Sequence, residues 1–484
     1  MTQPTTAHCQ EGRLEGLLDN DVHAFFDIPY AVNAGRFRPA APPVLWSGTR
    51  DCTRPGPIFP QLPSRLDFVA GPTAEDLDMS EDAFRLNVFT PSLTGKLPVI
   101  FWIHGGGFLT GAGSLQCYFG HQLARSGRAV VVSMNYRLGL LGNLFMKGVS
   151  QGNLAVRDLE MALLWVRENI ANFGGDPDAI VSVGQSAGAW FTQLLASMES
   201  TGPLLKSGVM LSYPGLLPMQ PAAGEAMAER ACTIAEIGAS GESLTTMPVD
   251  RILELQTSML RELRSLGEVP VIFRTVAHGN VPGDPGEQAR KIFAGKPLLI
   301  GWTREEMGSF LASDPAVLNV TEEQVREKFM REFGEQGEQR YARSRMSRLD
   351  TRPYSAVVEL GTNKLFKAPS IEFASGMEAT GSKVFAYQFD YPSPQPNVGA
   401  CHCYELPFVF GNFENWPNAP MLDGLDMHAA QTLSARIQGY LLNFVENDDP
   451  NGGDLPYWPA YDHAHGQRTL HFAQVIEAVA TAAE

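Results

Sequence analysis

Five short apolar runs in the first two thirds of the chain constrain its fold more than any other feature. They are rich in Val and Ile, do not alternate with polar residues and are bounded by turn residues. Strands buried on both faces of a parallel sheet have this character. The runs are LPVIFWI (97–103), AVVVSMN (129–135), AIVSVG (179–184), GVMLS (208–212) and PLLIG (297–301).

Helical patterns lie between and after these runs. In residues 153–175, apolar side chains recur at helical spacing, and the glycine pair that begins at Gly174 marks the end of the helix. A second helix is predicted over 321–333, where Thr321 and Gln324 have the spacing of a capping box. The alternation of strand and helix predicts an α/β fold, with helices on both faces of a mostly parallel central sheet.

The chain has 484 residues and shows no internal repeat or linker that would divide it. After about residue 215 the pattern becomes more helical, yet apolar strand-like runs still occur at 297–301 and 383–389. We therefore expect one domain over 1–484, with helical excursions from the sheet around 215–295 and 310–380.

Composition and charge exclude several classes of function. Apolar residues make up 44% and charged residues 19%, which is typical of a soluble globular protein. The net charge of -16 repels nucleic acid and anionic lipid surfaces, so we expect neither as a partner. No signal peptide or membrane-spanning run is apparent, and the six scattered cysteines fit reduced thiols, so we expect a cytoplasmic protein.

The segment VSVGQSAGAW contains a serine, Ser186, between glycines two positions away on either side. It follows a predicted strand and precedes a predicted helix. In that context G-x-S-x-G forms a tight turn that holds the serine hydroxyl above the sheet. Glycine is needed at Gly184 and Gly188 because strand and helix approach too closely there for side chains. Ser186 is therefore a candidate nucleophile.

A glycine-rich loop, HGGG, follows the predicted strand at 97–103. Acyl transfer generates an oxyanion, and backbone N–H groups of such a loop can point at it without steric interference. The order of this loop and the serine turn along the chain is the order found in α/β hydrolases. Together the two elements predict acyl-transfer chemistry.

A serine nucleophile needs a base, and the base needs an acid to orient it. His402 lies in a loop after the strand-like run 383–389, where a base can be presented over the sheet, whereas His463 and His465 lie in a polar segment near the end of the chain. Glu305 and Glu306 both follow the run that ends at Gly301. Reasoning from the residues leaves these two acids as alternatives.

At these residues the sequence resembles the type-B carboxylesterase and cholinesterase-like family of α/β hydrolases, and most closely its bacterial para-nitrobenzyl-esterase-like members. The resemblance covers nearly the whole chain, and its segments occur in the family's order. They include FDIPYA, GRFRPAAPPVLW, PGPIFPQ, SEDAFRLNVFTP, HGGGF, NYRLGLLG, WVRENIANFGGDP, GQSAGA, HCYELPFVFGN and WPAY.

The resemblance implies a role for each candidate residue. Ser186 corresponds to the nucleophile, His402 to the base and Glu306, five residues after Gly301, to the acid. The implied oxyanion donors are the backbone N–H groups of three residues, and two further residues are implied to order the site. The donors are on Gly106, Gly107 and Ala187, and the ordering residues are Gln185 and Ser212.

This chain departs from the family pattern at three positions. Ala83 and Phe59 stand where many relatives have cysteines, so the family's first disulfide cannot form. Gln185 stands where glutamate is usual and removes a negative charge beside the nucleophile. Specialisation for a cationic choline ester is therefore not expected, since a cation gains from nearby carboxylates.

We expect no cofactor and no metal. Cys401 and Cys403 flank His402, but adjacent residues in an extended loop point in opposite directions, and no second ligand pair completes a zinc site. The predicted function is hydrolysis of small to medium, neutral or apolar carboxylic esters through an acyl-enzyme. Two alternatives are amide or carbamate hydrolysis on the same triad, and a binding module without catalysis.

Overall fold

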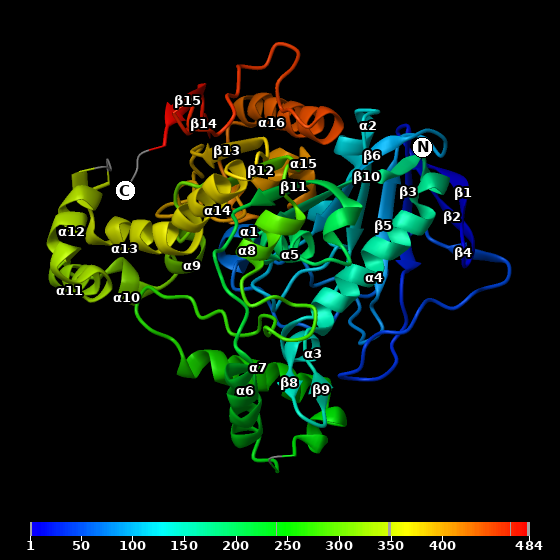
Figure 1. The fold of residues 1–484 in the computed structure, drawn as a ribbon, viewed down its shortest axis with the longest axis horizontal. Coiled ribbons are helices and arrows are strands. Elements are labelled where there is room, and N and C mark those ends of the chain that lie inside the picture. Colours follow the sequence, from blue (N-terminus) through cyan, green and yellow to red (C-terminus); the bar gives the residue numbers. More distant parts are fainter. Residues whose placement is uncertain (1, 239, 347–349, 465, 482–484) are drawn as a thin grey trace.

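The computed structural model describes residues 2–238, 240–346, 350–464 and 466–481. Within these ranges a 13-stranded sheet has the order β1-β2-β3-β5-β7-β6-β10-β11-β12-β13-β14-β15, and β4 pairs with β2 (Figure 1). Two short strands, β8 and β9, form a separate pair. The strands are β1 Gln3–Cys9, β2 Gly12–Asp19, β3 Val22–Pro29, β4 Thr49–Asp51, β5 Arg85–Thr90, β6 Leu97–Ile103, β7 Val130–Met134, β8 Phe145–Met146, β9 Ser150–Gln151, β10 Gly175–Gln185, β11 Leu205–Leu211, β12 Leu298–Thr303, β13 Val384–Phe389, β14 Arg468–Phe472 and β15 Ile476–Ala480.

The middle of the sheet is parallel. Strands β7, β6, β10, β11, β12, β13 and β14 are neighbours in that order, and each pair is parallel. Every residue of β7 and of β12 is buried, as expected for strands covered on both faces. The predicted α/β fold with a mostly parallel central sheet is confirmed.

Antiparallel strands extend both sides of this parallel centre. On one side β5, β3, β2 and β1 pair in antiparallel fashion, and on the other β15 pairs with β14. These strands were not among those predicted from the sequence. In β1 buried and exposed residues alternate, so the strand has no continuous apolar run to mark it.

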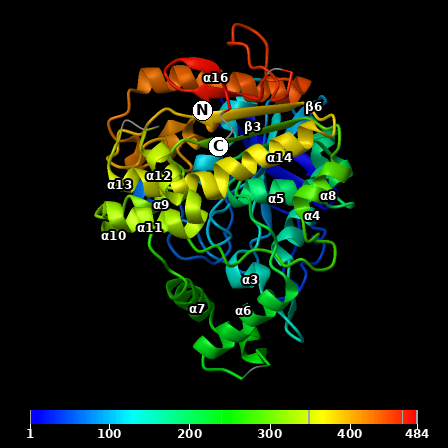
Figure 2. The same ribbon diagram turned by 60° about the vertical axis from the view of Figure 1, so that its left-hand side comes forward.

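Successive side chains of each central strand enter two different cores. On β6, Phe101 and Ile103 pack in the core shared with α4 and α5, whereas Ile100 and Trp102 pack in the core shared with α16. Figure 2 shows α16 on one side of the sheet and α4, α5 and α14 on the other. Alternation of side chains along a strand places helices on both faces.

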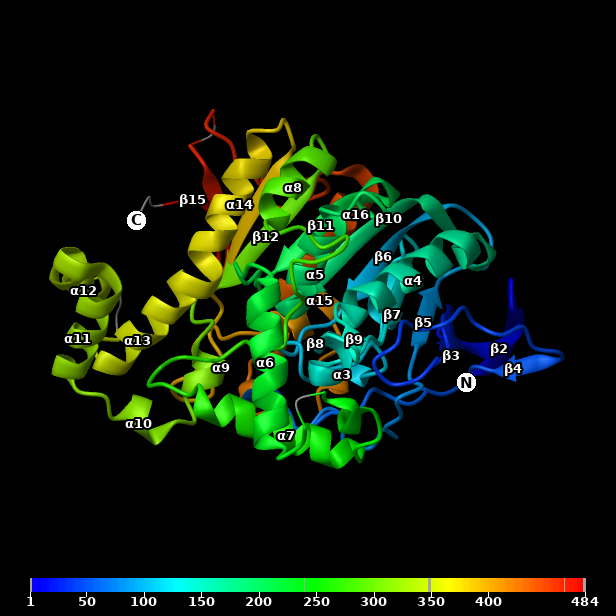
Figure 3. The same ribbon diagram turned by 60° about the horizontal axis from the view of Figure 1, so that its bottom comes forward.

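Most of the remaining helices lie in the two predicted excursions. Figure 3 shows α6 and α7 in one group and α11 to α13 in another, both away from the central strands. Helix α11 begins with the predicted capping box of Thr321 and Gln324. The helices are α1 Asp67–Ala70, α2 His121–Arg125, α3 Gly139–Asn143, α4 Leu154–Asn169, α5 Ala187–Ala196, α6 Pro221–Ile234, α7 Val249–Glu262, α8 Pro285–Ile292, α9 Gly308–Leu311, α10 Pro315–Leu318, α11 Glu322–Phe333, α12 Gly337–Met346, α13 Pro353–Thr362, a π-helical turn Asn363–Lys367, α14 Ala368–Glu378, α15 Leu406–Phe410 and α16 Met427–Asn447.

Among the helices in the described ranges, none has both the length and the apolar character needed to cross a bilayer.

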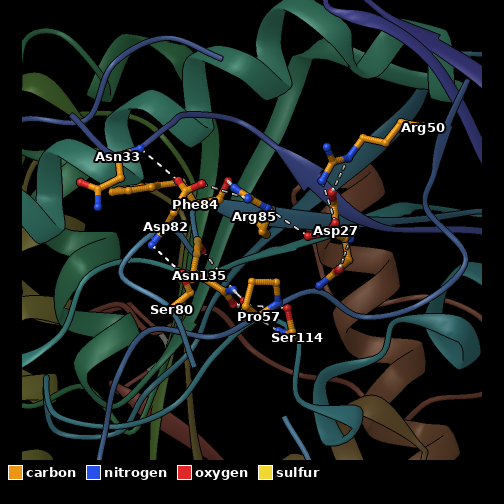
Figure 4. Close-up of polar contacts among 12 residues, drawn as sticks. Asp27, Asn33, Arg50, Pro57, Ser80, Asp82, Phe84, Arg85, Ser114 and Asn135 are labelled. Atoms are coloured by element: carbon orange, nitrogen blue, oxygen red, sulfur yellow. Dashed lines mark hydrogen bonds and ion pairs between the residues drawn. The ribbon is translucent and has the colours of Figure 1, made fainter. Parts of the chain in front are cut away.

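A polar network joins the first 90 residues to the loop that follows β6 (Figure 4). Arg85 on β5 forms an ion pair with Asp27 at 3.0 Å. Asn135, just after β7, donates from Nδ2 to the Pro57 carbonyl at 3.0 Å, and its Oδ1 accepts from the Ser114 backbone N–H at 3.3 Å. Because Asn135 contacts both segments, it holds them side by side, and both contribute to the cavities described below.

Candidate active site

Ser186 lies in a tight turn between β10 and α5. Its backbone has φ 57° and ψ -123°, and its N–H donates to the Leu211 carbonyl at 2.9 Å. A Cβ atom added to Gly184 would lie 2.2 Å from the Gly188 oxygen, and one added to Gly188 would lie 1.9 Å from the Ile103 oxygen. The close approach of strand and helix therefore requires both glycines, as the sequence analysis predicted.

His402 and Glu306 are buried and contact each other directly. The His402 Nδ1 atom lies 2.5 Å from Glu306 Oε2, and Glu306 Oε1 accepts from the Thr303 backbone N–H at 2.8 Å. Glu305 faces elsewhere, because its Oε2 accepts from the Ala400 N–H at 2.9 Å. Of the two candidate acids, Glu306 is the one whose side chain contacts the imidazole.

The imidazole of His402 is held on several sides. Ser309 Oγ donates to the His402 carbonyl at 2.7 Å. The rings of Phe310 and Phe366 lie 5.2 Å and 4.9 Å from the imidazole, measured between centroids. The two aromatic rings restrict rotation of the imidazole, and the bond from Ser309 fixes the backbone of His402. The hydrogen bond to Glu306 therefore has a defined geometry.

Three backbone N–H groups near Ser186 have no acceptor within the described part of the chain. They belong to Gly106, Gly107 and Ala187, the three predicted oxyanion donors. Gly106 and Gly107 have φ of 115° and 60°, and Ala187 is the first residue of α5. Donors that are fixed by the fold and unused are suited to stabilise a negative charge that develops on a substrate.

Gln185 lies against the imidazole on the side away from Glu306. Its Nε2 is 3.3 Å from His402 Nε2, and its Oε1 accepts from Cys403 Sγ at 3.5 Å. Among the described residues no hydrogen bond joins Ser186 Oγ to His402. In this state the Gln185 amide neighbours His402 Nε2, the nitrogen to which a nucleophilic serine would donate. A serine–histidine hydrogen bond of this kind often forms only when substrate is bound.

Glu405 is a buried carboxyl group at the site that the sequence analysis missed. Its Oε1 accepts from Ser212 Oγ at 3.0 Å, which places the predicted ordering serine in contact with it. Burial, and then the nearby charge of Glu306, raises the pKa of Glu405 to about 8. Glu405 follows His402 by three residues, and that spacing is the one signal by which it could have been found.

Three cavities lie at or near these residues. One of about 40 Å³ is lined by Ser186, His402 and Gly107 and by apolar side chains such as Phe310 and Val271. Phe310 also lines a wider outer cavity of about 450 Å³. A third, of about 130 Å³, is lined by Gly105 and Gln185. The first two cavities share wall residues, so they are neighbours.

In the part of the chain that the structure describes, no three His, Cys, Asp or Glu side chains are grouped so that they could hold a metal ion. Cys401 and Cys403 are buried beside His402, but the Nδ1 atom of the imidazole is bonded to Glu306. Burial raises the pKa of both thiols. The adjacent thiols are therefore protonated at neutral pH.

Comparison with known proteins gives a consistent result over the whole chain. The model of the family described as "Carboxylesterase family" matches residues 3–481. Phenmedipham hydrolase of Pseudarthrobacter oxydans is 35% identical over 95% of this chain and 93% of its own length. Para-nitrobenzyl esterase of Bacillus subtilis is 32% identical over the same shares. Among solved structures, a carboxylesterase of Geobacillus stearothermophilus has a TM-score of 0.86 at 32% identity, over 98% of this chain and 97% of its own.

Proposed function

Because the chain belongs to the carboxylesterase family and is a carboxylic ester hydrolase, we propose that Ser186, His402 and Glu306 carry out the reaction through an acyl-enzyme. The observation that carries this assignment is the 2.5 Å contact between His402 Nδ1 and Glu306 Oε2, beside a serine in a strained turn. Glu306 fixes the tautomer in which Nε2 is free to accept a proton, and it stabilises the imidazolium.

In the first half of the reaction, bound substrate displaces the Gln185 amide from His402 Nε2, and Ser186 Oγ donates a hydrogen bond to that nitrogen. The hydroxyl then attacks the ester carbonyl while His402 takes its proton. The carbonyl oxygen becomes an oxyanion and accepts hydrogen bonds from the N–H groups of Gly106, Gly107 and Ala187. Collapse of this intermediate releases the alcohol, to which His402 returns the proton.

In the second half, a water molecule takes the place of the alcohol. His402 removes a proton from the water, which attacks the acyl carbon bound to Ser186 Oγ. The same three N–H groups stabilise the second oxyanion, and the carboxylic acid leaves as Ser186 regains its proton. Amide or carbamate hydrolysis on the same residues is the alternative: an amide releases an amine in place of the alcohol, and a carbamate transfers a carbamoyl group to Ser186.

Labelling with a fluorophosphonate tests whether Ser186 is the nucleophile. Such reagents phosphonylate an activated serine, and the adduct is found by peptide mass spectrometry. In the wild-type protein we expect one modified peptide, the one that contains Ser186. In Ser186→Ala we expect none. Modification of another serine in both proteins would contradict the assignment.

Two further expectations from the sequence stay predictions. One is that residues 1–484 form a single domain, and the other is a cytoplasmic location.

A further inference from the structure

The guanidinium group of Arg65 lies in the cavity next to the proposed oxyanion donors. Arg65 lines the same cavity as Ser186, His402 and Gly107. A Cβ atom added to Gly107 would lie 2.5 Å from Arg65 Nη2, so the guanidinium is in contact with this part of the glycine-rich loop. Arg65 also lines the outer cavity and therefore marks the junction between the two.

This guanidinium has no anionic partner within the described ranges of the chain. Its Nη1 donates to the Pro270 carbonyl at 3.2 Å. Arg65 is exposed to solvent at the edge of the cavity, and none of the described carboxylates forms an ion pair with it. By contrast, Arg50 and Arg137 contact carboxylates at 2.7 Å and 2.6 Å. Arg65 is thus an arginine whose charge is not balanced by a neighbouring side chain.

An exposed guanidinium without an ion-pair partner is hydrated in the free enzyme, and it can exchange that water for an anion. The wall of the cavity beside Ser186 is largely apolar, with residues such as Phe310, Phe366 and Val269, whereas Glu268 and Asp314 line the second cavity. Arginine is suited to a planar anion, because two of its N–H groups can donate in parallel to a carboxylate. A substrate bound beside Ser186 can therefore bring a carboxylate to Arg65.

We propose that Arg65 binds a carboxylate group carried by the ester substrate, so that the preferred substrates are esters with an acidic group on the acyl or the alcohol part. This inference rests on the proposed function and gives its substrate class. It goes beyond the expectation of neutral or apolar substrates by adding an acidic group to an otherwise apolar ester. The apolar walls would contact the carbon skeleton of the same substrate.

Two matched pairs of esters test the proposal, one for each position of the carboxylate. On the acyl side, mono-para-nitrophenyl adipate is compared with para-nitrophenyl hexanoate, in which a methyl group replaces the carboxylate. On the alcohol side, 4-acetoxybenzoate is compared with its methyl ester. The ratio of kcat/KM within each pair is measured for the wild type, Arg65→Met and Arg65→Lys, so that differences in intrinsic reactivity cancel.

We expect Arg65→Met to lower the ratio of acidic to neutral ester by about tenfold or more for one of the two pairs. Activity on the neutral ester of that pair should stay within about threefold, and Arg65→Lys should retain part of the preference, because it keeps the charge but not the fork of donors. Arg251→Met is the control. Arg251 pairs with Glu254 at 2.7 Å on the exposed side of α7 and lines neither cavity, so its removal should leave both ratios unchanged.

Unchanged ratios in Arg65→Met for both pairs would overturn the proposal. An equal loss on acidic and neutral esters would also overturn it, since Arg65 would then stabilise the oxyanion or the fold. If Arg65→Met does not fold, Arg65→Gln carries the same comparison. If the wild type hydrolyses none of the four esters, the proposed function itself fails, and this inference fails with it.

Discussion

At the scale of single residues, Glu405 is the feature of the site whose chemistry differs most from what its residue type suggests. A glutamate is ordinarily ionised at neutral pH, but burial beside Glu306 favours the protonated form of this one. A neutral Glu405 adds no second negative charge beside the contact between His402 and Glu306.

The pKa of Glu405 makes stability depend on pH in a defined direction. The folded protein raises this pKa from 4.5 to about 8, so between these values the folded state binds more protons than the unfolded state. Stability contributed by the neutral form is therefore lost as pH rises through this window. We expect the Tm of the wild type to fall more between about pH 6 and about pH 9 than that of Glu405→Gln. Melting curves at the two pH values measure this, and equal declines in both proteins would contradict it.

At the scale of elements, a buried ion pair joins α4 to the loop that follows β7. Arg137 donates from Nε and Nη2 to the two oxygens of Asp158 at 2.8 Å and 2.6 Å. The two side chains are 6% and 0% exposed, so water does not screen the pair. Arg137 Nη1 also donates to the Arg38 carbonyl at 2.6 Å. Arg137 therefore links α4 to the loop after β7 and to the segment that contains Arg38.

Removing one partner of this pair should destabilise the protein strongly. Arg137→Met leaves the Asp158 carboxylate buried without its counter-charge, which typically costs about 3–5 kcal/mol. In the double variant Arg137→Met/Asp158→Leu no unpaired charge remains, and much of that loss should be recovered. Denaturant unfolding of the three proteins measures the difference. A double variant as unstable as the single one would show that packing, and not charge, dominates here.

At the scale of the whole molecule, local patterns were sufficient to predict the centre of the fold. The run 97–103 coincides with β6 because it is apolar throughout and ends at the glycine-rich loop. Strand β10 begins at Gly175, four residues before the predicted run. The prediction missed residues 175–178 because they do not form an apolar run. The antiparallel strands β1 and β2 could not be predicted in the same way, since buried and exposed residues alternate along much of each.

The site was predictable where a motif fixes the backbone, and not where the tertiary structure brings residues together. Ser186 and its flanking glycines follow from the turn that they form. The preference for Glu306 over Glu305 came from the family resemblance, and in the structure the Glu306 side chain contacts the imidazole whereas the Glu305 side chain contacts the Ala400 N–H. Arg65 belongs to no motif, and it reaches the cavity only through the packing of its loop.

The central claim, ester hydrolysis at Ser186, is tested most directly by steady-state hydrolysis of para-nitrophenyl esters of increasing acyl length by the wild type and Ser186→Ala. The wild type should turn over these esters, with an optimum chain length set by the acyl cavity. The alanine variant should lose about 10⁴-fold or more in kcat, because only the oxyanion donors and binding remain. Equal turnover by the two proteins would show that Ser186 is not the nucleophile.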